Sequence, residues 1–385
     1  MLHTYSVNLP GPSHLAGGVP CQDACCVANL GGGLVVAAVA DGLGSESRSD
    51  VGSRVACEGA VAFCARSIGS CGDDGAVLDL MVQAFYRAYD AVLATAAEAG
   101  ESAGEYDSTL CLAIFNGSKL FWGNAGDSGI VACAGDGTYR PVTAMHRDEE
   151  GRVFPLCFDE TWRFGVEEGI ASLLLCTDGI LEDVLAPPLL RVHGGRAVDA
   201  SKAEMFLHPR PDDAANLAEV ERQAAEYFAA YPKELLDDDK TLVVVFDDER
   251  LPGRQPDLYY AEPDWPALVV RANASLYPDR KREELSEEAA GAESEAVVAP
   301  EVAAEEEIAA HAAPEARTTR CLGKKTVQVG ELCTVGRLAQ AGAGSAAAAF
   351  GGEVASGRTE RRKPKKRRRP RGPKGRRAKR VWKRA

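Results

Sequence analysis

The chain has 385 residues, of which 45% are hydrophobic and 26% are charged, and its formal net charge is −13. This length allows one large hydrophobic core or two ordinary ones. No stretch approaches the roughly 18 consecutive apolar residues of a membrane-spanning helix, and the N-terminus lacks the basic segment and apolar core of a secretory signal. We therefore expect a cytoplasmic protein without a transmembrane segment.

Apolar runs bounded by turn residues predict six strands, at 33–41, 108–115, 119–125, 128–134, 170–178 and 240–247. After the first of them, apolar residues recur every three or four positions, which predicts two helices, over 47–68 and 76–100. Gly126-Asp127 separates two of the strands and predicts a tight hairpin, hence a partly antiparallel sheet. This pattern favours an α+β fold over a doubly wound one.

Beyond residue 250 the periodic pattern is lost. We expect an acidic Ala/Glu-rich linker over 251–320, a short β-like segment over 321–339, and a disordered, strongly basic tail over 340–385. Cys321 and Cys333 flank the β-like segment, but two cysteines are only half of a four-ligand zinc site, so a zinc site is the less favoured interpretation. The 12 cysteines lie mostly in apolar stretches, and no disulfide framework is expected.

The basic charge is concentrated at the C-terminus. Residues 358–385 hold 17 Lys or Arg and one acid, whereas the rest of the chain holds 27 basic and 56 acidic residues. Such a segment binds polyanions by releasing their counterions, which makes nucleic acid, an acidic protein or anionic lipid suitable partners. The alternative is that the tail binds the acidic domain of its own chain, which is present at high effective concentration.

Acidic residues stand next to several of the predicted strands. These are Asp23, Asp41, Asp127, Asp178 and Asp238. One such acid is ordinary turn chemistry, because Asp accepts hydrogen bonds from nearby backbone groups. Several carboxylates at one edge of a sheet would repel each other unless a cation neutralised them, and hard cations prefer oxygen ligands. A Mg²⁺ or Mn²⁺ centre is therefore predicted.

The order and context of these motifs resemble the metal-dependent serine/threonine protein phosphatases of the PP2C type (PPM), over roughly residues 1–248. The matching stretches are VPCQDACCV, VADGLGS, DSTLCLAIF with FWGNAGDSGIV, LLLCTDGILEDV and DDKTLVVVF. The resemblance implies a four-layer αββα sandwich of two antiparallel sheets flanked by helices. It also implies hydrolysis of phosphoserine and phosphothreonine in proteins by a water that two metal ions activate.

The resemblance also implies roles for individual residues. Asp41 would bridge two ions, Mn²⁺ or Mg²⁺, and Gly42 would offer its carbonyl to the second. Asp178 and Asp238 would hold the first ion, and Asp127 would face an optional third ion. Asp41, Asp178 and Asp238, together with Asp23, form the candidate catalytic set.

The chain departs from the family pattern at two positions near its N-terminus. Gln22 stands where members usually have a Glu that binds the second metal, so that site should be weaker, and Asp23 is the candidate to compensate. Gly18 stands where many members have an arginine that clamps the substrate phosphate. His14 is the suggested replacement, with an idle loop histidine as the alternative.

A further departure concerns a proton donor, and a further resemblance concerns two acids. Leu43 stands where some members have a histidine, and His146 is a candidate substitute without further support. Glu182 and Asp183 lie where the family often has another acid near the third metal, although an exposed acidic pair on a helix is the simpler interpretation.

Two other function classes compete with the phosphatase hypothesis. Because Gln22 and Gly18 depart from the pattern, the domain would serve in one alternative as a non-catalytic, phosphatase-like binding or regulatory module. In the other alternative the basic tail is primary, and the protein is a nucleic-acid-associated factor. The retained acids favour the enzyme.

Overall fold

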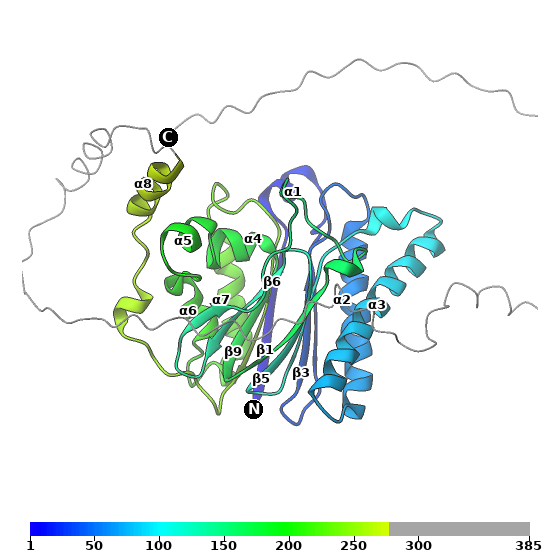
Figure 1. Ribbon diagram of the computed structural model, residues 1–385, viewed down its shortest axis with the longest axis horizontal. Coiled ribbons are helices and arrows are strands. Elements are labelled where there is room, and N and C mark those ends of the chain that lie inside the picture. Colours follow the sequence, from blue (N-terminus) through cyan, green and yellow to red (C-terminus); the bar gives the residue numbers. More distant parts are fainter. Residues whose placement is uncertain (277–385) are drawn as a thin grey trace, which may run out of the picture. The chain divides into compact units, whose positions relative to one another are not determined.

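Two five-stranded antiparallel sheets form the centre of the protein, as the computed structural model shows for residues 1–276 (Figure 1). The strand order is β1-β10-β9-β6-β7 in one sheet and β2-β3-β4-β5-β8 in the other. The strands are β1 (Leu2–Leu9), β2 (Ala24–Asn29), β3 (Val35–Ala40), β4 (Leu110–Phe115), β5 (Lys119–Ala125), β6 (Gly129–Ala134), β7 (Tyr139–Pro141), β8 (Arg163–Glu168), β9 (Ile170–Cys176) and β10 (Lys240–Asp247).

Eight α-helices accompany the sheets in this part of the chain. They are α1 (Pro12–Gly17), α2 (Ser49–Ser67), α3 (Asp74–Ala99), α4 (Asp178–Ile180), α5 (Pro188–His193), α6 (Ala200–Leu207), α7 (Leu217–Ala229) and α8 (Trp265–Leu276). A π-helical turn, Leu181–Leu185, continues α4, and short 3₁₀ turns cover Ile68–Ser70, Ala103–Tyr106, Asp159–Thr161, Ala214–Asn216 and Asp257–Tyr260.

The sheets and helices form four layers because both faces of each sheet are apolar and are covered. Strands β3, β4 and β9 are buried along their whole length, so both faces of each sheet are covered. One apolar cluster lies between the sheets and includes Val39, Trp122 and Val243. Helices α2 and α3 cover the outer face of the second sheet, and α4, α6 and α7 cover that of the first (Figure 1). The predicted αββα sandwich is confirmed.

Helix α3 shows why the sequence prediction of the helical pair is correct. Its buried residues recur at helical spacing, from Val77 to Ala96. Asp73 caps its first turn by accepting a hydrogen bond of 2.8 Å from the Ala76 N–H. Gly100 ends it in the left-handed conformation, at a φ of 71°.

The predicted hairpin between β5 and β6 is wrong, because the two strands belong to different sheets. Strand β5 pairs with β4 and β8, and β6 pairs with β7 and β9, so neither has a free edge for the other. Gly126, at a φ of 96°, turns the chain from one sheet to the other. All pairings in the described part of the chain are nevertheless antiparallel, as the α+β prediction requires.

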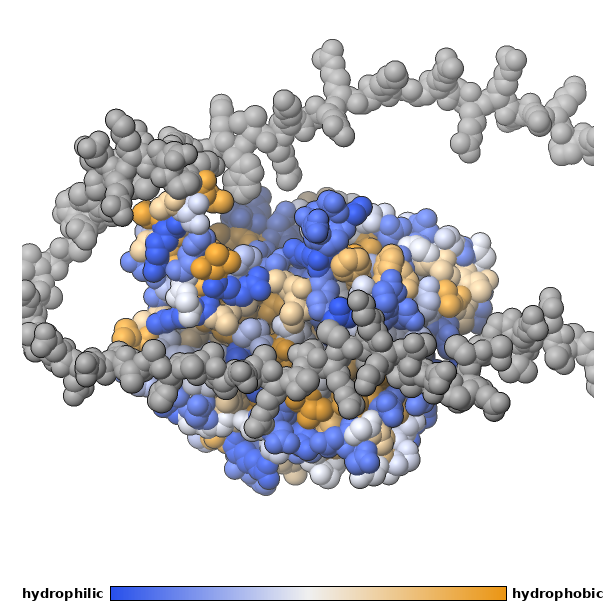
Figure 2. Space-filling view, in the orientation of Figure 1, coloured by the Kyte–Doolittle hydropathy of each residue, from blue (hydrophilic) through white to orange (hydrophobic). Residues whose placement is uncertain are grey.

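Residues after 250 pack against the first sheet and its helices. The Tyr259 hydroxyl accepts a hydrogen bond of 2.6 Å from the Tyr139 N–H, and Tyr260 is buried. Helix α8 follows, and its residues Val269 and Leu276 are exposed. The visible surface of the domain mixes hydrophilic and hydrophobic residues (Figure 2). The proposed segments at 321–339 and 340–385, and most of the proposed linker, lie outside the described residues. None of the helices within residues 1–276 has the length and apolar character that a membrane span requires.

Candidate metal centre

The acids singled out in the sequence meet at one end of the two sheets. The register puts the start of β2 beside the end of β3, with Ala24 opposite Ala40, and the start of β10 beside the end of β9, with Leu242 opposite Cys176. The end of β5 lies beside the start of β4, with Ala125 opposite Leu110. The five acids flank these strand ends: Asp23, Asp41, Asp127, Asp178 and Asp238.

Three of these acids form the closest group. Asp41, Asp127 and Asp178 each offer one carboxylate oxygen, and the three oxygens lie within 4.8 Å of one another. Two negative charges at that separation repel by roughly 3 kcal/mol if the effective dielectric constant is about 20. The group therefore needs positive charge to remain ionised.

The electrostatics identify Asp41 as the centre of the cluster. Burial raises the pKa of Asp41 well above its usual range, and the carboxylates of Asp23, Asp178, Asp127 and Asp238 raise it further. Burial is also the main cause that raises the pKa of Asp178 to about 7, with Asp127 and Asp238 adding to it. The other four acids thus all act on Asp41.

The donor chemistry fits a hard divalent cation. Carboxylate oxygens are the ligands that Mg²⁺ and Mn²⁺ prefer. Asp127 is fully buried, and its Oδ1 atom has no hydrogen-bond partner among the described residues. An unpaired buried carboxylate oxygen is costly, so this atom is suited to a cation.

Asp238 and Asp23 lie at the border of this group. Asp238 is exposed, and its Oδ1 accepts a hydrogen bond of 2.8 Å from the Asp239 N–H. It is not among the three acids whose oxygens meet. Asp23 is buried and accepts a hydrogen bond of 2.7 Å from the Thr177 hydroxyl. Burial raises the pKa of Asp23 well above its usual range, and Asp239 and Asp238 raise it further, although the Thr177 hydrogen bond opposes them.

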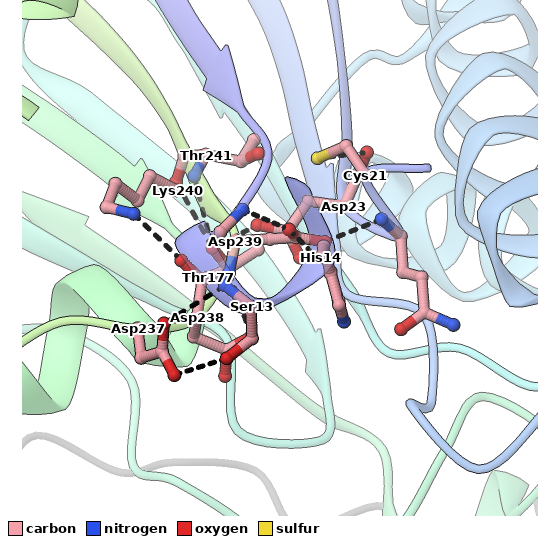
Figure 3. A network of polar contacts seen from close by, with 12 residues as sticks. Ser13, His14, Cys21, Asp23, Thr177, Asp237, Asp238, Asp239, Lys240 and Thr241 are labelled. Atoms are coloured by element: carbon pink, nitrogen blue, oxygen red, sulfur yellow. Dashed lines mark hydrogen bonds and ion pairs between the residues drawn. The ribbon is translucent and has the colours of Figure 1, made fainter. Parts of the chain in front are cut away.

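Asp239 connects both sheets to the N-terminal loop, and the sequence analysis missed it (Figure 3). It is buried and accepts three hydrogen bonds. The Gly11 and Gln22 backbone N–H groups each donate at 2.6 Å, and His14 Nδ1 donates at 2.8 Å. The signal was present in the run of three acids before β10, but the spacing alone did not distinguish which acid points inward.

His14 is held in a defined orientation by this contact. A carboxylate only accepts hydrogen bonds, so the Nδ1 atom of His14 carries the proton and Nε2 remains for another partner. His14 lies on α1, and its side chain is 25% exposed. Gly18 caps the same helix at a φ of 65°.

Gly42 is required by the packing of backbone around it. A Cβ atom there would lie 2.6 Å from the Ser49 carbonyl oxygen and 2.7 Å from that of Gln22. The Gly42 N–H donates to the same Gln22 oxygen at 3.1 Å. This close approach fixes the turn that carries Asp41.

Gln22 is nearly buried, and its side-chain amide binds α2. The side-chain Nε2 donates to the Ser49 hydroxyl at 2.8 Å, and the backbone carbonyl oxygen of Gln22 accepts from the Ser53 hydroxyl at 2.6 Å. The side chain and the backbone of Gln22 together tie the first motif to the start of α2.

Arg147 lies inside the acidic cluster and was also missed. Its guanidinium contacts Asp127 at 2.7 Å, Asp178 at 3.0 Å and Glu182 at 2.9 Å. Glu182 therefore belongs to the site and not to an exposed helix face, whereas Asp183 is exposed. The sequence offered only a basic residue next to His146, in a loop without periodicity.

His146 does not fit the role of a proton donor at this site. Its Nδ1 atom is buried and has no hydrogen-bond partner within the described part of the chain. Burial is the main cause that lowers its pKa. Within residues 1–276, no hydrogen bond or ion pair joins the His146 side chain to the five acids.

The chain is similar to known proteins in both sequence and fold. A family model described as protein phosphatase 2C matches residues 10–220, which is more than half of the chain. No significant match exists among proteins with curated functions. Solved structures with a similar fold include the catalytic domain of the serine threonine protein phosphatase PstP in complex with two manganese ions, with 20% identity, a TM-score of 0.40, and coverage of 64% of this chain and 97% of that one.

Two further solved structures are similar. One is PppA, a regulatory component of T6SS in Pseudomonas aeruginosa, with 18% identity, a TM-score of 0.43, and coverage of 64% of this chain and 97% of that one. The other is serine/threonine phosphatase Stp1 from Staphylococcus aureus, with 13% identity, a TM-score of 0.44, and coverage of 64% of this chain and 95% of that one.

Proposed function

This chain belongs to the protein phosphatase 2C family and is a protein serine/threonine phosphatase, and from that premise we propose that it acts through a metal-activated water. The observation that carries the proposal is the convergence of Asp41, Asp127 and Asp178 within 4.8 Å. These acids come from three separate strand ends, and their mutual repulsion favours a bound cation.

We assign the metal ligands to the residues of this end of the sheets. Asp41, Asp178 and Asp238 would hold two Mn²⁺ or Mg²⁺ ions, with the Gly42 carbonyl and the Gln22 amide as neutral oxygen donors. Asp127 would face a third ion. When bound, such a pair of ions lowers the pKa of a water molecule and neutralises charge on the phosphoryl oxygens.

Asp23 is proposed to compensate for the neutral Gln22. It is adjacent to Gln22 in sequence, and its carboxyl group is fixed by the Thr177 hydroxyl. Because burial and nearby acids raise its pKa, Asp23 is ionised most readily when cations offset those acids. It would add negative charge beside the second ion.

His14 is proposed to bind the substrate phosphate in place of the missing arginine. Asp239 orients the ring by its contact with Nδ1, so Nε2 is the atom available to a phosphate oxygen. The same Asp239 carboxylate binds the backbone of Gln22, which places the histidine beside the first acidic motif.

Hydrolysis of an aryl phosphate by the full chain tests this function. We expect activity with Mn²⁺, loss with EDTA, and a decrease of roughly 100-fold or more for Asp41→Asn and Asp238→Asn, because each removes charge that holds the ions. Asp90→Asn, on the exposed surface of α3, is the matched control and should retain activity. Turnover that persists in EDTA, or that survives Asp41→Asn, would reject the metal mechanism.

The same experiment addresses the non-catalytic alternative. A domain that only binds phosphoproteins should show no Mn²⁺-dependent turnover, yet should retain phosphopeptide binding. The convergence of three carboxylates favours the enzyme, since a cation-binding cluster is not needed for binding alone.

We further propose that residues 358–385 bind a polyanion, on the basis of their 17 Lys or Arg. Full-length protein should bind single-stranded nucleic acid with an affinity that falls steeply with salt, and a chain that ends at residue 357 should not. If the full chain binds no nucleic acid while the truncated domain binds the added tail peptide, the tail instead pairs with its own domain. The cytoplasmic location stays a prediction.

A further inference from the structure

The guanidinium of Arg147 binds three carboxylates at once. Its Nε and NH2 atoms contact Asp127 Oδ2, at 2.8 and 2.7 Å. NH2 also contacts Asp178 Oδ2 at 3.0 Å, and NH1 contacts Glu182 Oε2 at 2.9 Å. Two of these acids belong to the group that converges with Asp41.

These contacts differ from ordinary surface ion pairs. Asp127 is fully buried, and the side chains of Asp178 and Glu182 are 20% and 21% exposed. The planar fork of arginine suits a fixed position between carboxylates better than the flexible amine of lysine.

We propose that Arg147 is a built-in cation, which takes the place of an additional divalent ion between Asp127, Asp178 and Glu182. This inference rests on the proposed metal site. It means that the chain neutralises the Glu182 side of the cluster with its own side chain, so that ions bind on the side of Asp41, where the unpaired Oδ1 of Asp127 also lies open to an ion.

The two carboxylate oxygen atoms of Asp127 have different surroundings, as this proposal requires. Arg147 uses Oδ2 of Asp127, whereas Oδ1 of the same carboxylate is buried without a hydrogen-bond partner in the described structure. One oxygen thus meets the guanidinium while the other stays available to an ion. Arg147 is therefore a positioning residue, because it holds two acids in the orientation in which they face Asp41.

The number of bound ions tests this role separately from activity. The full chain and its Arg147→Gln variant are freed of metal, checked for folding by circular dichroism, and titrated with Mn²⁺ in a calorimeter. We expect Arg147→Gln to bind one more Mn²⁺ per chain than the wild type. The double variant Arg147→Gln/Glu182→Gln should return to the wild-type number, since Glu182 is then no longer available to the additional ion.

Two matched variants keep the test decisive if Arg147→Gln does not fold. Glu182→Gln alone should leave the number of bound Mn²⁺ unchanged, because its contact is with Arg147. Arg147→Lys retains the charge and should also gain no ion. Loss of an ion in Glu182→Gln, or gain of one in Arg147→Lys, overturns the inference.

The result distinguishes this inference from the proposed function. If wild type and Arg147→Gln bind the same number of Mn²⁺ ions, Arg147 does not replace an ion, although the metal mechanism stands. If neither protein binds Mn²⁺, both the inference and the metal mechanism fail.

Discussion

Thr177 and Asp23 join the two sheets at the metal end through a hydrogen bond of 2.7 Å, which the Thr177 hydroxyl donates. Thr177 follows β9 in one sheet, and Asp23 precedes β2 in the other. Both residues are buried. A carboxyl group in such a place requires a hydrogen-bond donor, because its desolvation is otherwise not compensated.

Thr177→Val should therefore destabilise the protein by about 1–3 kcal/mol, since it preserves the shape but leaves the Asp23 oxygen without its donor. Urea unfolding followed by circular dichroism measures this loss. Thr177→Ser keeps the hydroxyl and is the control. Equal stability of the Val and Ser variants would show that the hydrogen bond contributes nothing.

Gly42→Ala should impair both stability and activity. The added Cβ would lie within 2.7 Å of two carbonyl oxygens, so the turn must move, and Asp41 with it. We expect a destabilisation of about 1–3 kcal/mol. Gly44→Ala is the matched control, because its Cβ would lie 3.7 Å from the nearest Gln22 side-chain atom. A Gly42→Ala enzyme with wild-type Mn²⁺ affinity would argue against this role.

The stability of the metal-free protein should depend on pH through Asp178. Its folded pKa is raised from 3.8 to about 7, mainly by burial. Between these values the folded state binds more protons than the unfolded state, so the free energy of unfolding falls as pH rises. The melting temperature without metal should decrease from pH 5 to pH 8, and Mn²⁺ should raise it more at pH 8. Asp178→Asn should flatten this slope.

His14→Gln should raise KM for a phosphopeptide more than it lowers kcat, because the proposed contact is with the bound phosphate. The loss should be roughly 10- to 100-fold, as expected for one hydrogen bond to a charged group, which contributes about 1.5–3 kcal/mol. Asp239→Asn should have a similar effect on KM, since it weakens the contact that orients His14, but it should also lower stability. His193→Gln, on α5, is the control. An unchanged KM in His14→Gln would show that His14 does not bind the substrate phosphate.

The sequence determined the elements and the acids of this protein. Strands such as 170–178 and the helices at 47–68 and 76–100 are set by local spacing of apolar residues, which the chain carries by itself. The acids next to the strands could be identified from the sequence because each directly adjoins such an apolar run. Even so, spacing did not identify β1 or β8, whose polar and apolar residues mix at the edge of each sheet.

Only the tertiary structure decided which groups meet. Strands β5 and β6 lie in different sheets because β5 pairs with β4 and β6 pairs with β9. The two-residue turn between them does not indicate which partner each strand takes. Arg147 and Asp239 became site residues because partners distant in sequence surround them. Electrostatic and hydrogen-bond contacts depend on distance in space, and the sequence records only distance along the chain.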